Sequence, residues 1–211
     1  MCLGWSDFDQ EVATELIYEF PERLERVARM LKLFDTGVHS LEVKKQEGDE
    51  PDDAKYSLTA IHKMGSRDVH FPFSQESTGT QRLLGLADAV IDALDNGSLL
   101  LVDELGSNIH PRIARRLVKW FQNSETNPNK AQLFFTSHDN TLWRNQLLRR
   151  DQIWLTKKVE DGSTKVYPLS DFKQRNDKAI DKAYLEGLYG GVPILPFDEA
   201  EPFVMQKGDV K

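Results

Sequence analysis

The sequence contains a single cysteine, Cys2, among its 211 residues, so it can form no internal disulfide. This cysteine usage makes an intracellular setting the default, and we expect a cytoplasmic protein. No apolar run approaches the ~20 residues that a membrane-spanning helix requires. Acidic residues at Asp7, Asp9 and Glu11 are also unlike a secretory leader. We therefore expect no membrane partner.

An excess of positive charge is lacking as well. The formal net charge is −7, which argues against a broad basic surface for nucleic acid. A local stripe at helical spacing, formed by Arg112, Arg115, Arg116 and Lys119, could contact phosphates or simply be a solvated helix face. The five histidines lack metal-ligand spacing and no cysteine pair accompanies them, so we expect no structural metal.

The phosphate-binding loop pattern Gly-x-x-x-x-Gly-Lys-Ser/Thr does not occur, and no glycine in the sequence is directly followed by lysine. Such a loop supplies a lysine and most of the backbone donors for nucleotide phosphates. A site built from these 211 residues alone would therefore hold nucleotide weakly.

The clearest chemical feature present is Leu99 to Glu104, four apolar residues running into two adjacent carboxylates. A short apolar run fits a strand buried on both faces of a parallel sheet. Ligands of open α/β sheets bind beyond the carboxyl ends of such strands. There Asp103 could hold Mg²⁺, and Glu104 could orient and polarise the water that attacks a γ-phosphate.

A helix is predicted upstream, where Ser77 to Gln81 precede apolar residues at three- and four-residue spacing. Thr78 with Gln81 fits a capping box, and Gly79 lets backbone approach a ligand. Free amides at a helix N-terminus also bind phosphate oxygens. Ser77 and Gly79 are therefore candidate γ-phosphate contacts, and Gly97 is expected just past the end of this helix.

Downstream, Gly106 to Pro111 lead into a second helix, followed by a strand at 132–136 that ends in Ser137-His138-Asp139. A strand, crossover helix and strand form a parallel βαβ unit. His138 is thus expected at the same sheet edge as Asp103 and Glu104, where imidazole could donate to a transferring phosphoryl group.

The rest of the chain is predicted from turns and periodicity. Residues 1–37 are expected to be helical (9–19 and 21–34), and 38–75 to form a β-meander with strands near 38–43, 56–62 and 69–73. A hairpin is expected around Asp161-Gly162, and a helix near 178–188 that ends at Gly190-Gly191. The tail 196–211 is expected to be flexible.

Four motifs in order resemble the C-terminal half of an ABC-type ATPase head. They are a signature-like segment at Ser77 to Gln81, a Walker B at Leu99 to Glu104, a D-loop-like segment at Ser107 to Pro111 and a switch histidine at His138. The chain is most similar to stand-alone prokaryotic AAA-type ATPases with ABC-like cores, several of which serve restriction or phage defence. Family members carry the phosphate loop in a preceding half, which this sequence lacks.

This resemblance covers about residues 15–195 and implies an α/β fold, a partial P-loop NTPase with a mainly parallel core sheet. We expect a single partial head over residues 1–195, with the signature, Walker B and switch core at 76–195. It implies ATP and Mg²⁺ as cofactors, with Mg²⁺ on Asp103, Glu104 as catalytic base and His138 as switch. Nucleotide contacts are implied at a set of polar and glycine positions: Ser77, Thr78, Gly79, Thr80, Gln81, Ser107 and Asn108.

The predicted function is ATP binding and hydrolysis in a defence-related complex. The expected partner is a second copy or a chain that carries Walker A, with a nuclease or DNA-linked effector in the same system. The alternative is a non-enzymatic interaction module, or an inactive remnant, that docks on a Walker A-bearing partner. A signature with a single glycine, where ABC heads usually have Ser-Gly-Gly-Gln, affects only the detailed contacts.

Overall fold

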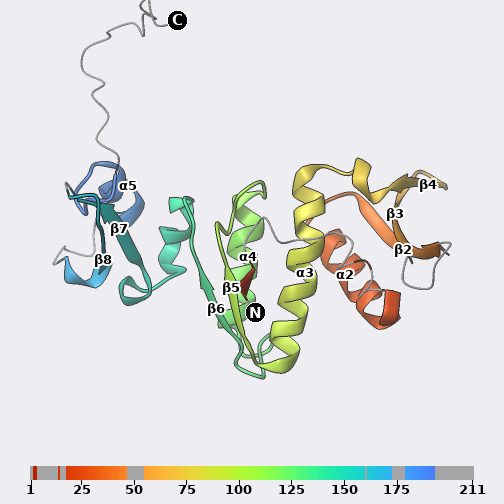
Figure 1. Cartoon of the computed structure of the whole chain (residues 1–211), viewed down its shortest axis with the longest axis horizontal. Helices are drawn as coiled ribbons and strands as arrows, with labels where there is room; N and C mark the ends of the chain where they lie inside the picture. Colours follow the sequence, from red (N-terminus) through yellow and green to blue (C-terminus); the bar gives the residue numbers. More distant parts are fainter. Residues whose placement is uncertain are drawn as a thin grey trace, which may run out of the picture. The chain divides into compact units, whose positions relative to one another are not determined.

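The structure is a computed structural model that describes residues 2–3, 14, 18–46, 55–159, 161–172 and 179–192 (Figure 1). The chain divides into two compact units, Met1–Leu147 and Leu148–Lys211. The expected helix at 9–19, the acidic turn at 47–53 and the tail at 196–211 lie largely or wholly outside the described residues. The expectation of one head through residue 195 stays a prediction.

The first unit contains a helix and an antiparallel meander. Helix α2 (Pro21–Leu33) begins with proline, whose fixed φ suits a first turn. Strands β2 (Val38–Gln46), β3 (Lys55–Met64) and β4 (Arg67–Pro72) pair antiparallel in the order β2-β3-β4. The short 3₁₀ turn η1 (Phe73–Gln75) leads onward with Phe73 fully buried. The predicted meander is confirmed.

A parallel sheet forms the second layer of this unit. Strands β1 (Cys2–Leu3), β5 (Leu99–Val102) and β6 (Gln132–Phe135) lie in the order β1-β5-β6, and both pairs are parallel. The expectation that residues 1–37 are helical is wrong at Cys2–Leu3, because these residues pair with Leu101 and Val102 as a strand. Helix α3 (Thr78–Asn96) precedes β5, and α4 (Pro111–Gln122) connects β5 to β6. The predicted βαβ unit is confirmed, and it aligns the carboxyl ends of β5 and β6.

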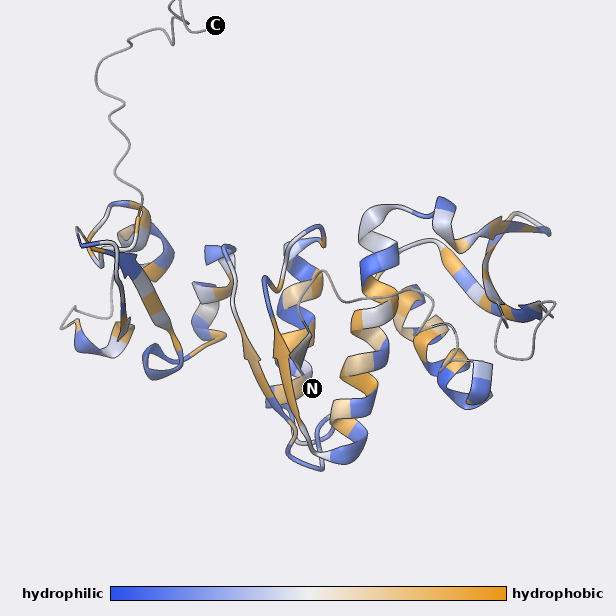
Figure 2. Cartoon of the chain, in the orientation of Figure 1, coloured by the Kyte–Doolittle hydropathy of each residue, from blue (hydrophilic) through white to orange (hydrophobic). Residues whose placement is uncertain are grey.

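One face of the β5–β6 pair is buried and the other is partly open. Leu100 and Val102 are 1% and 4% exposed, whereas Leu99 is 45% and Phe134 is 64% exposed. The register pairs Leu101 with Phe134, which places these apolar side chains on the same face. Figure 2 shows both strands as hydrophobic along their length. The prediction that β5 is buried on both faces is wrong for the described part of the chain, because no described helix covers this second face.

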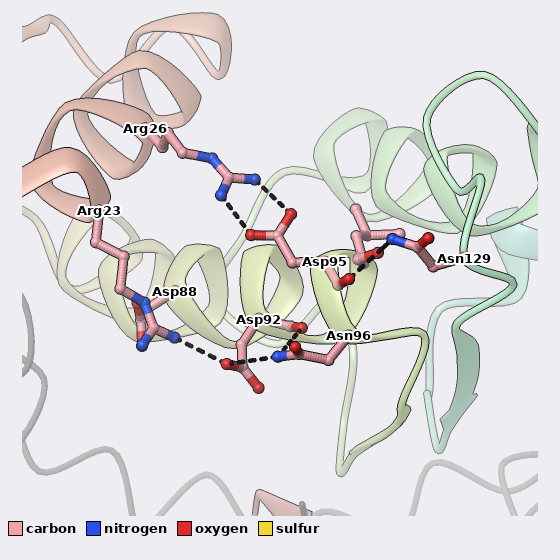
Figure 3. Close-up of polar contacts among 8 residues, drawn as sticks. Arg23, Arg26, Asp88, Asp92, Asp95, Asn96 and Asn129 are labelled. Carbon is pink, nitrogen blue, oxygen red and sulfur yellow. Dashed lines mark hydrogen bonds and ion pairs between the residues drawn. The ribbon is translucent and has the colours of Figure 1, made fainter. Parts of the chain in front are cut away.

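Ion pairs join α2 to α3 (Figure 3). Arg23 lies between two carboxylates, with Nε 2.8 Å from Asp88 Oδ1 and Nη2 3.2 Å from Asp92 Oδ1, and Arg26 pairs with Asp95. Burial raises the pKa of Asp88 despite the nearby Arg23. The Arg26 guanidinium instead lowers the pKa of the more exposed Asp95. The pairs therefore differ: desolvation dominates at Asp88 and attraction dominates at Asp95.

The end of α3 shows why glycine stands at position 97. Gly97 adopts the left-handed conformation with φ +62°, and a Cβ there would lie 2.3 Å from the Asn129 carbonyl oxygen. The Asn129 side-chain amide donates to the Leu94 and Asp95 carbonyl oxygens at 3.0 and 2.8 Å (Figure 3). These hydrogen bonds satisfy carbonyl oxygens in the last turn of the helix. The predicted glycine at the end of the helix is confirmed.

The first unit ends with η2 (Asn140–Gln146). The second unit begins with η3 (Arg150–Gln152), and an antiparallel hairpin of β7 (Trp154–Lys158) and β8 (Thr164–Pro168) follows. It continues with η4 (Leu169–Asp171) and helix α5 (Ile180–Leu185). The hairpin is as predicted. The predicted helix 178–188 is shorter, because the chain turns at Gly187, where φ is +77°. Tyr167 Oη donates to the Tyr189 carbonyl oxygen at 2.9 Å, which ties the hairpin to the segment after α5. Within the ranges given above, no helix combines the length and apolarity needed to span a membrane.

Candidate functional site

The carboxyl ends of β5 and β6 bring together Asp103, Glu104 and His138. His138 Nε2 lies 3.5 Å from Glu104 Oε1, and the two side chains are 93% and 46% exposed. Asp103 and Glu104 are the first and second residues after β5, and His138 is the third after β6, so the parallel register places them at one edge. The predicted neighbourhood of the two carboxylates and the histidine is confirmed as geometry, while their chemical roles stay predictions.

Thr136 holds the two carboxylate residues in place. Its Oγ1 accepts a hydrogen bond from the Glu104 amide at 2.7 Å and donates one to Asp103 Oδ1 at 2.5 Å. Its backbone continues the ladder, because the Thr136 amide donates to the Val102 carbonyl oxygen and the Thr136 carbonyl oxygen accepts from the Leu105 amide. Thr136, the first residue after β6, thus fixes the course of the chain as it leaves β5. No local signal in the sequence marks Thr136 for this role.

The loop after β5 has an unusual backbone. Glu104, Gly106 and Asn108 all have positive φ, at +53°, +105° and +58°. L-residues adopt this region at a cost, which persists where surrounding contacts enforce it. Ser137 supplies such a contact, since its Oγ donates to the Leu105 carbonyl oxygen at 2.6 Å. The turn that carries Glu104 is therefore held by the segment that follows β6 rather than by its own propensity.

The N-terminus of α3 differs in detail from the predicted capping box. Ser77, not Thr78, is the cap residue, and its Oγ accepts from the Thr80 amide at 3.1 Å. The Gln81 side chain donates to the carbonyl oxygens of Ser74 and Glu76 instead of reaching the cap amide. The capping-box prediction is wrong, because Ser77 caps the helix one residue earlier than expected, so that Thr80 and not Gln81 stands three residues beyond the cap.

The signature-like segment packs against the loop after β5. A Cβ on Gly79 would lie 2.7 Å from the Asn108 carbonyl oxygen, so only glycine allows this approach. Arg82 Nη1 donates to Ser107 Oγ at 3.1 Å and to its carbonyl oxygen at 3.2 Å. The structure therefore brings the predicted residues Ser77 to Gln81 next to Ser107 and Asn108. Arg82, which the sequence analysis missed, provides the link.

The donor set fits Mg²⁺ only in part. Asp103 offers hard carboxylate oxygens, and Mg²⁺ in nucleotide sites usually takes one or two carboxylates together with phosphate and water oxygens. Among the residues that the structure describes, no cluster of three or more histidine, cysteine, aspartate or glutamate side chains could hold a metal alone. Asp103 thus suits an ion that arrives with a nucleotide rather than a resident metal.

A parallel sheet with flanking helices and with carboxylates beyond the end of a strand defines an α/β domain with a candidate ligand site. Residues 3–144 match the family described as "AAA domain, putative AbiEii toxin, Type IV TA system". The chain belongs to this family. At this coarse level it is an ATPase-like, nucleotide-binding domain.

The crystal structure of the SmcHead bound to the C-winged helix domain of ScpA is similar, with a TM-score of 0.47 and 15% sequence identity. The similarity covers 85% of this chain and 49% of that chain, so this chain spans about half of its length. Among curated proteins there is no match.

Proposed function

We propose that this protein binds ATP with Mg²⁺ and hydrolyses it as the C-terminal part of an ABC-type ATPase head in a defence-related complex. The phosphate-binding loop would come from polypeptide outside these 211 residues, either a second segment or a partner chain. The observation that carries the proposal is the meeting of Asp103, Glu104 and His138 at one sheet edge, clamped by Thr136. The family's description as an AAA domain and a type IV system toxin agrees with it.

Each residue has a role that its position suits. Asp103 would hold Mg²⁺, which neutralises phosphate charge in such reactions. Glu104 would accept the proton of the attacking water, and its half-exposed side chain leaves space for that water. His138, 3.5 Å from Glu104, would donate a hydrogen bond to the γ-phosphate and orient Glu104.

The signature-like segment would act on nucleotide held by another subunit. The Thr78 and Gly79 amides stand in the first turn of α3, where a helix has no internal acceptors for its N–H groups. Ser77 and Thr80 are exposed and buried respectively, and their hydroxyls are 2.9 Å apart. We therefore assign phosphate contact to the backbone amides, with Ser107 and Asn108 positioning the segment.

The partly open sheet face supports a composite head. Purely parallel sheets are almost always covered on both faces, yet Leu99 and Phe134 stay 45% and 64% exposed. Further polypeptide over this face would complete the core, and a segment that carries the phosphate loop is the one the family's chemistry requires. The exposed sheet face also favours the second candidate function, a module that docks on a partner through this face without hydrolysing ATP.

The test is phosphate release from the assembly isolated with its native partners. We expect Glu104→Gln to retain ATP binding and to lower turnover at least ~100-fold, the lower range for loss of a general base. Glu125→Gln is the matched control, because Glu125 is an exposed carboxylate beyond the end of α4. Turnover of Glu104→Gln near that of the control would refute the role of Glu104. An assembly of wild-type chains with no turnover would instead identify a docking module.

A further inference from the structure

A basic groove lies between the end of α2 and the exposed side of α4. Its cavity measures about 790 Å³ and is lined by Leu33, Phe34 and Asp35 on one side. His110, Ile113 and four cationic residues of α4 form the other side, and the cations are Arg112, Arg115, Arg116 and Lys119. Phe34 stacks on Trp120 with ring centroids 5.4 Å apart, which fixes the end of α2 against α4.

The cations of this groove are not equivalent. Arg115 is structural, since its Nη1 donates to the carbonyl oxygens of Thr141 and Arg144 at 2.8 and 3.2 Å. Arg116 lies over the ring of Trp120, 5.9 Å from its centroid. Arg112 and Lys119 are exposed, and neither pairs with a carboxylate within the described ranges. Asp35 is the only acidic residue in the lining, so the groove has a strong local excess of positive charge in a chain of net charge −7.

We propose that this groove binds the phosphate backbone of nucleic acid without reading its sequence. Arg112, Arg116 and Lys119 follow one another on one helix face over about 10 Å of axis. One strand of a duplex presents a phosphate about every 3.4 Å along its axis, so about 10 Å spans roughly three such intervals and each of the three cations can lie near a phosphate. Arginine guanidinium groups bind phosphate oxygens through two parallel hydrogen bonds. The positive end of the α4 dipole lies at Arg112 and adds to the attraction.

An acidic protein segment suits the groove less well. A docking helix or strand gains most of its affinity from apolar contact, but Phe34 is only 7% exposed and Ile113 is half-buried. Leu33, at 50%, is the one largely exposed apolar side chain of the lining. An incoming ligand would therefore contact the exposed cationic side chains more than the apolar side chains of the groove. Because the rest of the chain is acidic, the contact must be local and strongly dependent on salt.

The experiment is fluorescence anisotropy of a labelled duplex of about 20 base pairs and mixed sequence, titrated with the full chain from about 50 to 200 mM salt. No ATP or Mg²⁺ is present, so the result is independent of the proposed ATPase function. We expect binding that weakens as salt rises. In Arg112→Gln/Lys119→Gln, two phosphate contacts are lost, so the slope of log K against log salt should become shallower by about 1.8.

The matched control is Lys63→Gln/Arg67→Gln, which removes two exposed cations from the ends of β3 and β4 that flank their turn. It should keep the wild-type slope, and thermal unfolding should show that both variants are folded. Three results would overturn the proposal: no binding at the lowest salt, an unchanged slope in the groove variant, or an equal loss in the control. Binding of poly-glutamate without binding of the duplex would also overturn it, and would assign the groove to an acidic protein segment.

Discussion

Replacing Thr136 by valine tests whether this residue clamps the strand end that carries Asp103 and Glu104. Valine keeps the shape of threonine but removes the hydroxyl that accepts from the Glu104 amide and donates to Asp103. A hydrogen bond contributes about 0.5–1.5 kcal/mol, and more where one partner is charged. Thr136 is exposed, so water can replace part of this loss. We therefore expect a decrease of about 1 kcal/mol in the free energy of unfolding.

A change of this size lowers the melting temperature by about 2–4 °C in a chain of this length. The sharper readout is hydrogen exchange at the Glu104 amide, which should accelerate in Thr136→Val. Thr136→Ser is the control, because it keeps the hydroxyl and should retain most of the protection. If exchange at Glu104 were the same in the wild type and in both variants, the clamp would not exist and the reasoning about the site would fail.

Three further changes test packing and electrostatics in the first unit. Gly79→Ala should destabilise the protein by at least ~1 kcal/mol in chemical denaturation, because the new Cβ would lie 2.7 Å from the Asn108 carbonyl oxygen; exposed Thr78→Ala should cost less. The raised pKa of Asp88 means that its ionisation weakens the fold, so stability falls as pH rises from the ordinary value of 3.8 through the raised folded value. In Asp88→Asn this carboxyl no longer ionises, so the melting temperature should decrease less than that of the wild type as pH rises above 3.8. The pKa of Asp95 is lowered, so its contribution is present above 3.8 and is lost as pH falls below it. Asp95→Asn should therefore cost under ~1 kcal/mol near neutral pH and less in acid; equal losses at both pH values would contradict this.

The sequence predicted the elements that depend on local signals. Pro21 and Pro111 start helices, Gly97 ends one, and the apolar run before Asp103 forms a strand. The parallel pairing of β5 and β6 followed from the handedness and length of the crossover, and it placed His138 beside Glu104.

What could not be predicted depends on contacts between distant residues. The Gln81 side-chain amide donates to the carbonyl oxygens of Ser74 in η1 and of Glu76 just after it, and no local pattern in the sequence places these acceptors beside Gln81. The roles of Thr136 and Arg82 depend on bonds across more than 20 positions, which no periodicity encodes. The half-open sheet face also has no local signal, because Leu99 belongs to an apolar strand and Phe134 to an apolar run, as a strand buried on both faces would.

The most direct test of the ATPase account is the identity of the nucleotide that stays on the native assembly. The assembly would be exposed briefly to radiolabelled ATP with Mg²⁺, separated from free nucleotide, and its bound ATP and ADP measured. The account predicts mainly ADP on the wild type and mainly unhydrolysed ATP on Glu104→Gln, because that variant keeps the binding contacts and loses the base. The same ratio of ATP to ADP on both would contradict the assignment of Glu104, and with it the hydrolytic site at the ends of β5 and β6.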